Sequence, residues 1–160
     1  MITVTLGTSP FPFDRVILWL DHLLKTGIID EPMFVQYGAS NVAALRSNPL
    51  VESVAMLNFD ILMDKVKQSR LTISHAGQGS TRTLIKRGAA FVLLPRLATY
   101  GEHIDNHQLT FAQTVAQWGV TYCISLAELE QVFTHVPLPL SESTLEGPQL
   151  VDHLCKVYPR

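Results

Sequence analysis

The chain has 160 residues, of which 47% are hydrophobic and 16% are charged, and its formal net charge is −2. This length and apolar content predict one domain with a substantial core, and the lack of any Lys/Arg cluster argues against a nucleic-acid partner. The longest apolar runs, 16–20 and 89–94, are far shorter than the roughly 18 residues of a membrane span. No secretory leader is evident either, so we expect a cytoplasmic protein.

Short apolar runs alternate with amphipathic segments along the chain. The pattern predicts, in chain order, strand 2–6, helix 14–26, strand 33–36, strand 51–56, helix 58–69, strand 71–75, helix 80–87, strand 91–94, helix 106–118, strand 121–124, helix 125–135 and a last helix from Pro148. This alternation favours βαβ units and a parallel sheet. We predict an α/β fold in which residues 1–160 form a single Rossmann-like, doubly wound domain, whose ligands bind beyond the carboxyl ends of the strands.

The strongest local signal is the turn after the strand at 71–75, which reads SHAGQGST over residues 74–81. Gly77 and Gly79 let the backbone approach a bulky anion, and the following helix start offers N–H groups and a positive dipole end. The segment has neither the P-loop pattern nor the G-x-G-x-x-G fingerprint. It predicts a phosphate site, with a tight strand–helix turn capped by Ser80 as the alternative.

Two more polar segments follow predicted strands. Gly7, Thr8 and Ser9 supply small residues and hydroxyls after the first strand, for which an ordinary turn is the alternative. Segment 101–108, GEHIDNHQ, holds six charged, imidazole or amide side chains that can hydrogen-bond several sugar hydroxyls, with a solvated loop as the alternative. Its His103 and His107 lie four residues apart, but no third ligand at a supporting spacing is evident, so we expect no metal.

These segments together resemble the C-terminal domain of glycosyltransferase family 28. The resemblance rests on SHAGQGSTRTLIKRGAAFVLLPRLATYGEHIDNHQ at 74–108, ITVTLGTSPFPFDR at 2–15 and the Gln-x-Gly at 36–38, and it covers residues 1 to about 125. Within the family, the chain is most similar to the small catalytic subunits of two-component UDP-sugar transferases. These include the dolichol-linked GlcNAc transferase and bacterial exopolysaccharide glucuronosyltransferases. The resemblance implies the donor-binding half of a GT-B enzyme.

The resemblance also implies a set of site residues. The donor-binding set comprises Gly7, Thr8, Gln36, Ser74, His75, Gly77, Gly79, Ser80, Thr83, His107 and Gln108. The backbone at 77–80 would hold the diphosphate of a UDP-sugar, with Gly7 and Thr8 facing it. His75 would lie beside the phosphates or the bound sugar. His107 and Gln108 would contact sugar hydroxyls. Thr83 departs from the family, which commonly has a glutamate there for the ribose hydroxyls, and this implies weaker or different donor binding.

The resemblance further implies a split enzyme. A complete enzyme of this kind has two Rossmann-like domains, and this chain has room for one. We expect a membrane-anchored partner to bind the lipid-linked acceptor and to recruit the chain to the cytoplasmic face of the membrane. The partner would dock near Phe11, Phe13 and the loop 96–104. For the two phenylalanines, a lid over the donor and simple core packing are the alternatives, and core packing is slightly favoured. It would also supply the general base, for which His75 is the best candidate on this chain. No metal or other cofactor is expected, because backbone amides and a helix dipole can meet the charge of the leaving diphosphate.

The leading functional hypothesis is therefore an inverting glycosyltransferase subunit that transfers a hexose, of the GlcNAc or glucuronic acid type, to a lipid-linked saccharide. Two alternatives stay open. One is a non-catalytic nucleotide-sugar-binding or regulatory subunit, for which Thr83 is the main support. The other is a Rossmann-like NAD protein, against which the missing glycine fingerprint and the missing acidic residue count.

Overall fold

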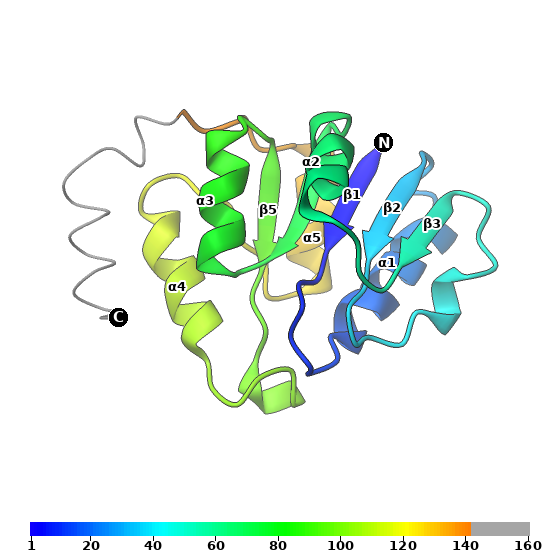
Figure 1. Cartoon of the computed structure of the whole chain (residues 1–160), viewed down its shortest axis with the longest axis horizontal. Helices are drawn as coiled ribbons and strands as arrows, with labels where there is room; N and C mark the ends of the chain where they lie inside the picture. Colours follow the sequence, from blue (N-terminus) through cyan, green and yellow to red (C-terminus); the bar gives the residue numbers. More distant parts are fainter. Residues whose placement is uncertain (142–160) are drawn as a thin grey trace.

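Five parallel strands form one sheet in the order β3-β2-β1-β4-β5 (Figure 1). The strands are β1 (Ile2–Thr5), β2 (Met33–Gln36), β3 (Val51–Val54), β4 (Leu71–His75) and β5 (Phe91–Leu94). This computed structural model describes residues 1–141. The predicted parallel α/β sheet is confirmed, and the strand order reverses between β1 and β4, which is where open sheets of this kind bind ligands.

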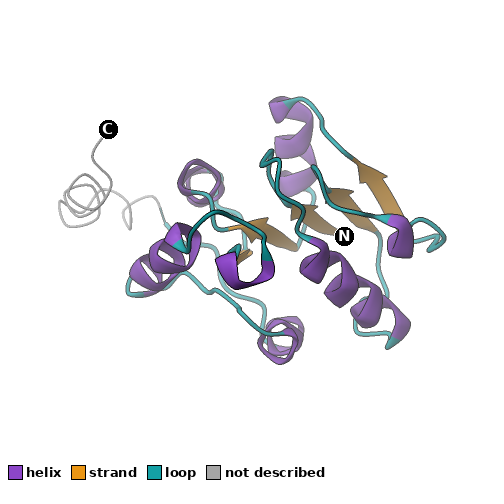
Figure 2. Cartoon of the chain, turned by 90° about the horizontal axis from the view of Figure 1, so that it is seen from below, coloured by secondary structure: helices purple, strands orange, loops and turns teal. Residues whose placement is uncertain are grey.

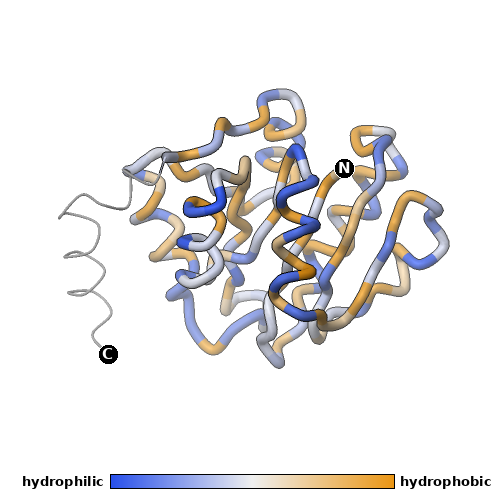
Figure 3. The backbone as a smooth tube through the Cα atoms, turned by 45° about the horizontal axis from the view of Figure 1, so that its top comes forward, coloured by the Kyte–Doolittle hydropathy of each residue, from blue (hydrophilic) through white to orange (hydrophobic). Residues whose placement is uncertain are grey.

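Helices cover both faces of the sheet, as Figure 2 shows. They are α1 (Asp14–Lys25), α2 (Phe59–Lys67), α3 (Gln78–Lys86), α4 (His107–Ala116) and α5 (Leu126–Thr134), with short 3-10 helices η1 (Ala43–Leu45) and η2 (Ala98–Tyr100). One core cluster joins α1 and α5 to the sheet, and a second joins α2, α3 and α4 to β5. Hydrophobic and hydrophilic positions alternate along the helices (Figure 3), as amphipathic helices packed on a sheet require.

Local sequence features explain where several helices begin. Asn58 caps α2 by accepting a hydrogen bond from the Asp60 amide. Ser125 and Glu128 form a capping box at the start of α5. Helix α1 begins directly after Phe13 and buries Val16, Ile17, Leu20, Leu23 and Leu24 against the sheet. These starts follow the sequence prediction within one or two residues.

Three expected features differ from the structure or fall outside it. The sixth strand expected at 121–124 is only a parallel bridge between Leu93 and Tyr122, so the named sheet has five strands. Helix α3 starts at Gln78 with Gly77 as its N-cap, not at Ser80, because the chain turns immediately after β4. The helix expected from Pro148 lies outside the described residues. Within residues 1–141, no helix is long and apolar enough to cross a membrane.

Candidate functional site

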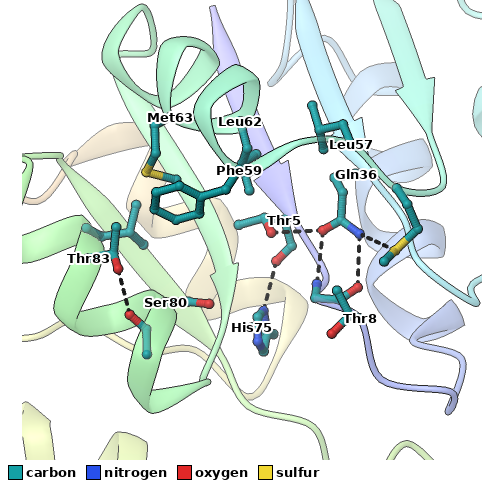
Figure 4. Close-up of a pocket in the computed structure, with 14 residues that line it drawn as sticks. Thr5, Thr8, Gln36, Leu57, Phe59, Leu62, Met63, His75, Ser80 and Thr83 are labelled. Atoms are coloured by element: carbon teal, nitrogen blue, oxygen red, sulfur yellow. Dashed lines mark hydrogen bonds between the residues drawn. The ribbon is translucent and has the colours of Figure 1, made fainter.

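A pocket of about 420 Å³ lies at the carboxyl ends of β1, β2 and β4, where the strand order reverses. That volume is within the range of small-molecule sites. Its lining consists of Thr5, Gly7, Thr8, Gln36, Met56, Leu57, Phe59, Leu62, Met63, His75, Gly79, Ser80, Thr83 and Leu84. Figure 4 shows a polar floor, formed by the strand ends and the start of α3, that faces an apolar wall from α2 and the segment before it.

Gln36 joins three segments at the floor of this pocket. Its Oε1 accepts hydrogen bonds from the Thr5 hydroxyl at 2.9 Å and the Gly7 amide at 3.1 Å. Its Nε2 donates to the carbonyls of Gly7 and Ala55, each at 2.9 Å (Figure 4). Because the buried amide is fully engaged, Gln36 holds the loops after β1 and β3 in place.

The imidazole of His75 fills the space between two glycines. A Cβ atom built on Gly7 would lie 2.7 Å from the ring, and one built on Gly77 would lie 2.5 Å from Nε2. Gly7 also has a φ of +77°, which side-chain-bearing residues rarely adopt. Both glycines are therefore required by the histidine itself, in addition to any role in binding an anion.

His75 is neutral at physiological pH. Burial is the main cause that lowers its pKa to about 4, the nearby Arg96 charge lowers it further, and the hydrogen bond to the Thr5 carbonyl opposes them. A carbonyl oxygen only accepts, so the His75 Nδ1, at 3.3 Å from that oxygen, carries the proton. Nε2 is then an acceptor of low basicity, which makes His75 a weak general base.

The start of α3 presents backbone amides to the pocket. The amide of Thr81 donates to the Gly77 carbonyl at 2.9 Å, so the amides of residues 78–80 precede the first helical hydrogen bond. A Cβ atom at Gly79 would meet nothing within 4 Å, so this face of the helix is open. Together with the helix dipole, these amides form an anion-binding arrangement.

No ionised side chain lines the pocket among the described residues. Its hydroxyl groups belong to threonines and Ser80, and Thr83 donates its own proton to the Gly79 carbonyl at 2.9 Å. No carboxylate therefore stands at position 83 or elsewhere in this lining. The opposite wall is apolar, and Phe59 and Met56 on it are 53% and 58% exposed. That wall suits a flat, partly apolar group rather than a second anion.

Arg96 is a buried cation that ties together the loops beside the pocket. Its side chain is fully buried, and its guanidinium donates to the carbonyls of Leu6 at 2.8 Å, Phe11 at 2.7 Å and Glu102 at 3.1 Å. It also stacks 4.6 Å from the centre of the Phe13 ring. Arg96 is the first residue of the loop 96–104, at which a partner was expected to dock. Its own side chain is not available for docking, because the guanidinium instead donates to carbonyls that the turns leave unpaired.

Glu102 and Arg15 form a second link between the same loops. The Glu102 carboxylate accepts from Arg15 Nε at 2.8 Å and Nη2 at 2.9 Å, and from the Leu97 amide at 2.9 Å. Glu102 is 2% exposed, so it is not one of the free polar groups expected in segment 101–108. An isolated Arg–Glu pair 87 residues apart carries no local sequence signal.

The sugar-contacting pair expected at His107 and Gln108 does not line the pocket. Gln108 is buried, and its Oε1 accepts from the Arg96 amide at 3.1 Å. His107, at the start of α4, is more exposed and its Nδ1 lies 2.5 Å from an Asp105 carboxylate oxygen. His103 Nδ1 lies 3.3 Å from the same oxygen. Asp105 thus adds a third potential metal ligand that the histidine spacing did not indicate.

The expected docking surface is only partly exposed. Phe13 is completely buried in the main core, so for this residue the core-packing alternative holds and it does not face a partner. Its ring lies under Arg15 and Arg96 at the start of α1. Tyr100, the last residue of η2, and Ile104, in the segment that follows it, are by contrast 61% and 77% exposed.

Most of the expected donor-binding residues converge, although they come from distant parts of the sequence. Those that line the pocket are Gly7, Thr8, Gln36, His75, Gly79, Ser80 and Thr83. Gly77 lies behind the His75 ring, and Ser74 is buried with its hydroxyl donating to the His75 carbonyl.

Several solved structures have a similar fold. The glycotransferase of kitacinnamycin matches with a TM-score of 0.59 at 14% identity, covering 98% of this chain and 37% of that protein. Acinetobacter baumannii MurG matches with a TM-score of 0.57 at 18% identity, covering 94% of this chain and 49% of MurG. The chain thus spans half or less of these two proteins. The solution structure of ALG13 matches with a TM-score of 0.57 at 17% identity, covering 86% of this chain and 87% of ALG13.

A comparison of the sequence with curated proteins finds no match. The family model described as "Glycosyltransferase family 28 C-terminal domain" matches residues 1–144, which include every described residue. The Rossmann-like fold and the pocket at the strand-order reversal agree with this match, and the chain belongs to glycosyltransferase family 28.

Proposed function

We propose that this chain is the donor-binding subunit of an inverting, UDP-sugar-dependent glycosyltransferase. The observation that carries the proposal is the pocket between the β1 loop and the start of α3. Within residues 1–141, this pocket offers backbone amides and hydroxyls but no charged side chain. Such a surface can hold a diphosphate through N–H groups and the helix dipole. The departing UDP is stabilised in the same way, so no metal is needed at the diphosphate.

We propose that the nucleoside lies against the apolar wall formed by α2. Phe59, Leu62 and Met63 offer a flat apolar surface across the pocket from Ser80. Thr83 contributes one hydroxyl oxygen as an acceptor for a ribose hydroxyl, since its proton is already donated to the Gly79 carbonyl. A single acceptor gives a weaker grip than a carboxylate would, so we expect modest affinity for the nucleotide.

The acceptor site and the general base are assigned to a membrane-anchored partner. His75 is a poor base because its pKa is about 4 and its Nδ1 already donates to Thr5. The exposed Tyr100 and Ile104 lie on a loop after β5 and provide apolar surface for such a partner. The partner would bring a lipid-linked saccharide to the donor at the cytoplasmic face of the membrane. The transferred hexose is of the GlcNAc or glucuronic acid type.

The binding half of this proposal is tested by Gly79→Val. The new side chain enters open space in front of the amides of α3, so it should block the diphosphate while the protein stays folded. Lys86→Val places the same side chain on the exposed distal end of α3 and is the matched control. Calorimetry should show UDP binding to the wild type and the control, and its loss in Gly79→Val. Equal affinity in all three proteins would refute the placement.

The catalytic half is tested by assaying transfer to a lipid-linked acceptor, first with the isolated chain and then with membranes that contain the candidate partner. We expect transfer only in the mixture, because holding the acceptor hydroxyl in line with the donor carbon can supply about 7–11 kcal/mol of the barrier reduction. Robust transfer by the isolated chain would refute the split enzyme. No transfer in either assay, with UDP binding intact, would favour a non-catalytic nucleotide-sugar-binding subunit, the candidate that the missing carboxylate at position 83 supports.

A further inference from the structure

Three side chains converge in the loop between η2 and the start of α4, outside the pocket described above. They are His103, Asp105 and His107, and one ligand atom from each lies within 4.8 Å of the other two. The Nδ1 atoms of both imidazoles lie near the same Asp105 oxygen, at 3.3 Å for His103 and 2.5 Å for His107. The two rings stand edge to face, with centroids 4.4 Å apart.

We propose that His103, Asp105 and His107 form a binding site for a borderline divalent cation such as Zn²⁺. Two imidazoles and one carboxylate are a ligand set that zinc favours, and three protein ligands leave one position for water or another ligand. Mg²⁺ does not suit this set, because it prefers oxygen ligands and retains its waters. The proposal does not depend on glycosyl transfer, since metal binding is measurable without donor or acceptor.

The distances from the Asp105 oxygen to the two histidine nitrogens can be compared with those around a tetrahedral ion. Bond lengths of about 2.0–2.1 Å to zinc place two ligand atoms roughly 3.3 Å apart. The contact between His103 and Asp105 already has that length. The His107 Nδ1 would have to withdraw from Asp105 by somewhat less than 1 Å, exchanging a hydrogen bond for a metal bond. His107 is 42% exposed, so its ring has room for that movement.

One ligand has a polar atom that the protein itself leaves unsatisfied. His103 Nδ1 is buried and makes no hydrogen bond, although it lies near Asp105. A buried nitrogen without a partner is costly, and a metal ion would satisfy it. The His103 ring is held by Phe11, whose ring centroid is 5.7 Å away. This contact limits how far the imidazole can turn away from the site.

The carboxylate is also held in place. The backbone amide of His107 donates to Asp105 Oδ1 at 3.1 Å, which restrains the carboxylate close to the two rings. An aspartate carboxylate is ordinarily ionised at neutral pH, so Asp105 offers an anionic ligand. The dipole at the start of α4 opposes a cation here, and the ionised carboxylate offsets that effect. All three ligands lie within five residues, so little loop-closure entropy is lost on binding.

The test is a titration of the chelator-treated full chain with Zn²⁺ by calorimetry. We expect the wild type to bind one Zn²⁺ ion per chain, without competition by Mg²⁺. The Kd for Zn²⁺ should rise more than about tenfold in each of three variants, His103→Gln, Asp105→Asn and His107→Gln. His135→Gln, an exposed histidine outside the cluster, is the control and should bind as the wild type does. Equal Zn²⁺ affinity in the wild type and the three cluster variants, or no binding by the wild type, would overturn the proposal.

A second measurement needs no variant and so does not depend on whether the variants fold. Imidazole nitrogen shifts of the wild type, followed by NMR during Zn²⁺ addition, should change at His103 and His107 and stay constant at His22 and His135. Changes confined to other histidines would place the metal elsewhere and refute the site.

Discussion

Two glycines at the same turn should respond to alanine in opposite directions. A Cβ atom at Gly77 would lie 2.5 Å from His75 Nε2 and 3.0 Å from its Cδ2, whereas one at Gly79 would meet nothing within 4 Å. Gly77 has ordinary extended torsion angles, φ −85° and ψ 132°, so alanine is allowed by the backbone and only the ring opposes it. Gly79 lies in the first turn of α3, where alanine is a better helix former.

The sizes of the two effects follow from these contacts. Overpacking costs about 1–3 kcal/mol, and replacing glycine recovers about 0.4–1 kcal/mol by restricting the unfolded chain. Gly77→Ala should therefore lower the free energy of unfolding by about 1–2 kcal/mol, and Gly79→Ala should raise it by about 0.4–1 kcal/mol. For a chain of this length, the loss in Gly77→Ala corresponds to a fall in Tm of roughly 2–8 °C.

Urea unfolding of both single variants, in wild-type and His75→Ala backgrounds, measures these energies. Without the imidazole, Gly77→Ala should lose its cost, while the gain from Gly79→Ala should be unchanged. The difference between backgrounds is the coupling of residue 77 to the ring. The reasoning is refuted if Gly77→Ala stabilises the wild type, or if its cost is the same when His75 is absent.

Other consequences of the site can be measured on the unliganded protein. The pKa of His75 is about 4 in the folded chain and near 6.5 in an unfolded one, so the unfolded state binds more protons between these pH values. The free energy of unfolding should therefore fall by up to about 3 kcal/mol as the pH drops from 6.5 to 4. His75→Gln should remove that part of the loss, as urea titrations at several pH values will show. Arg96→Met should lower the free energy of unfolding by about 2–5 kcal/mol in the same assay, since the carbonyls of Leu6 and Glu102 lose a buried donor. The control Arg70→Met, at a surface ion pair, should lower it by less than about 1 kcal/mol. Equal losses in the two variants would contradict the role of Arg96. Burial raises the pKa of the Cys123 thiol to about 12, so this residue should resist iodoacetamide at pH 8 in the folded protein and react in urea, as mass spectrometry of its peptide will show.

The fold and much of the pocket could be predicted from the sequence because the signals are local. Apolar strands of four or five residues alternate with helices whose apolar positions recur at helical spacing, and this order alone predicts a parallel sheet with ligands at its carboxyl edge. The residues after β1, β2 and β4 therefore had to lie near one another. The parallel register, which sets Thr5 beside both Gln36 and Ser74, is what brings Gly7, Gln36 and His75 together.

Tertiary structure alone decided which polar groups are free. The sequence does not distinguish buried polar residues from exposed, ligand-binding ones. The structure buries three such residues, Arg96, Glu102 and Gln108. Arg96 reaches Leu6 across 90 residues of sequence, and Glu102 reaches Arg15 across 87. Such contacts form because two loops bury unpaired carbonyls at the same place. The pattern of apolar residues along the chain does not predict which loops come together. The same applies to Asp105, whose position between two imidazoles depends on the turn into α4 and not on the spacing of the histidines.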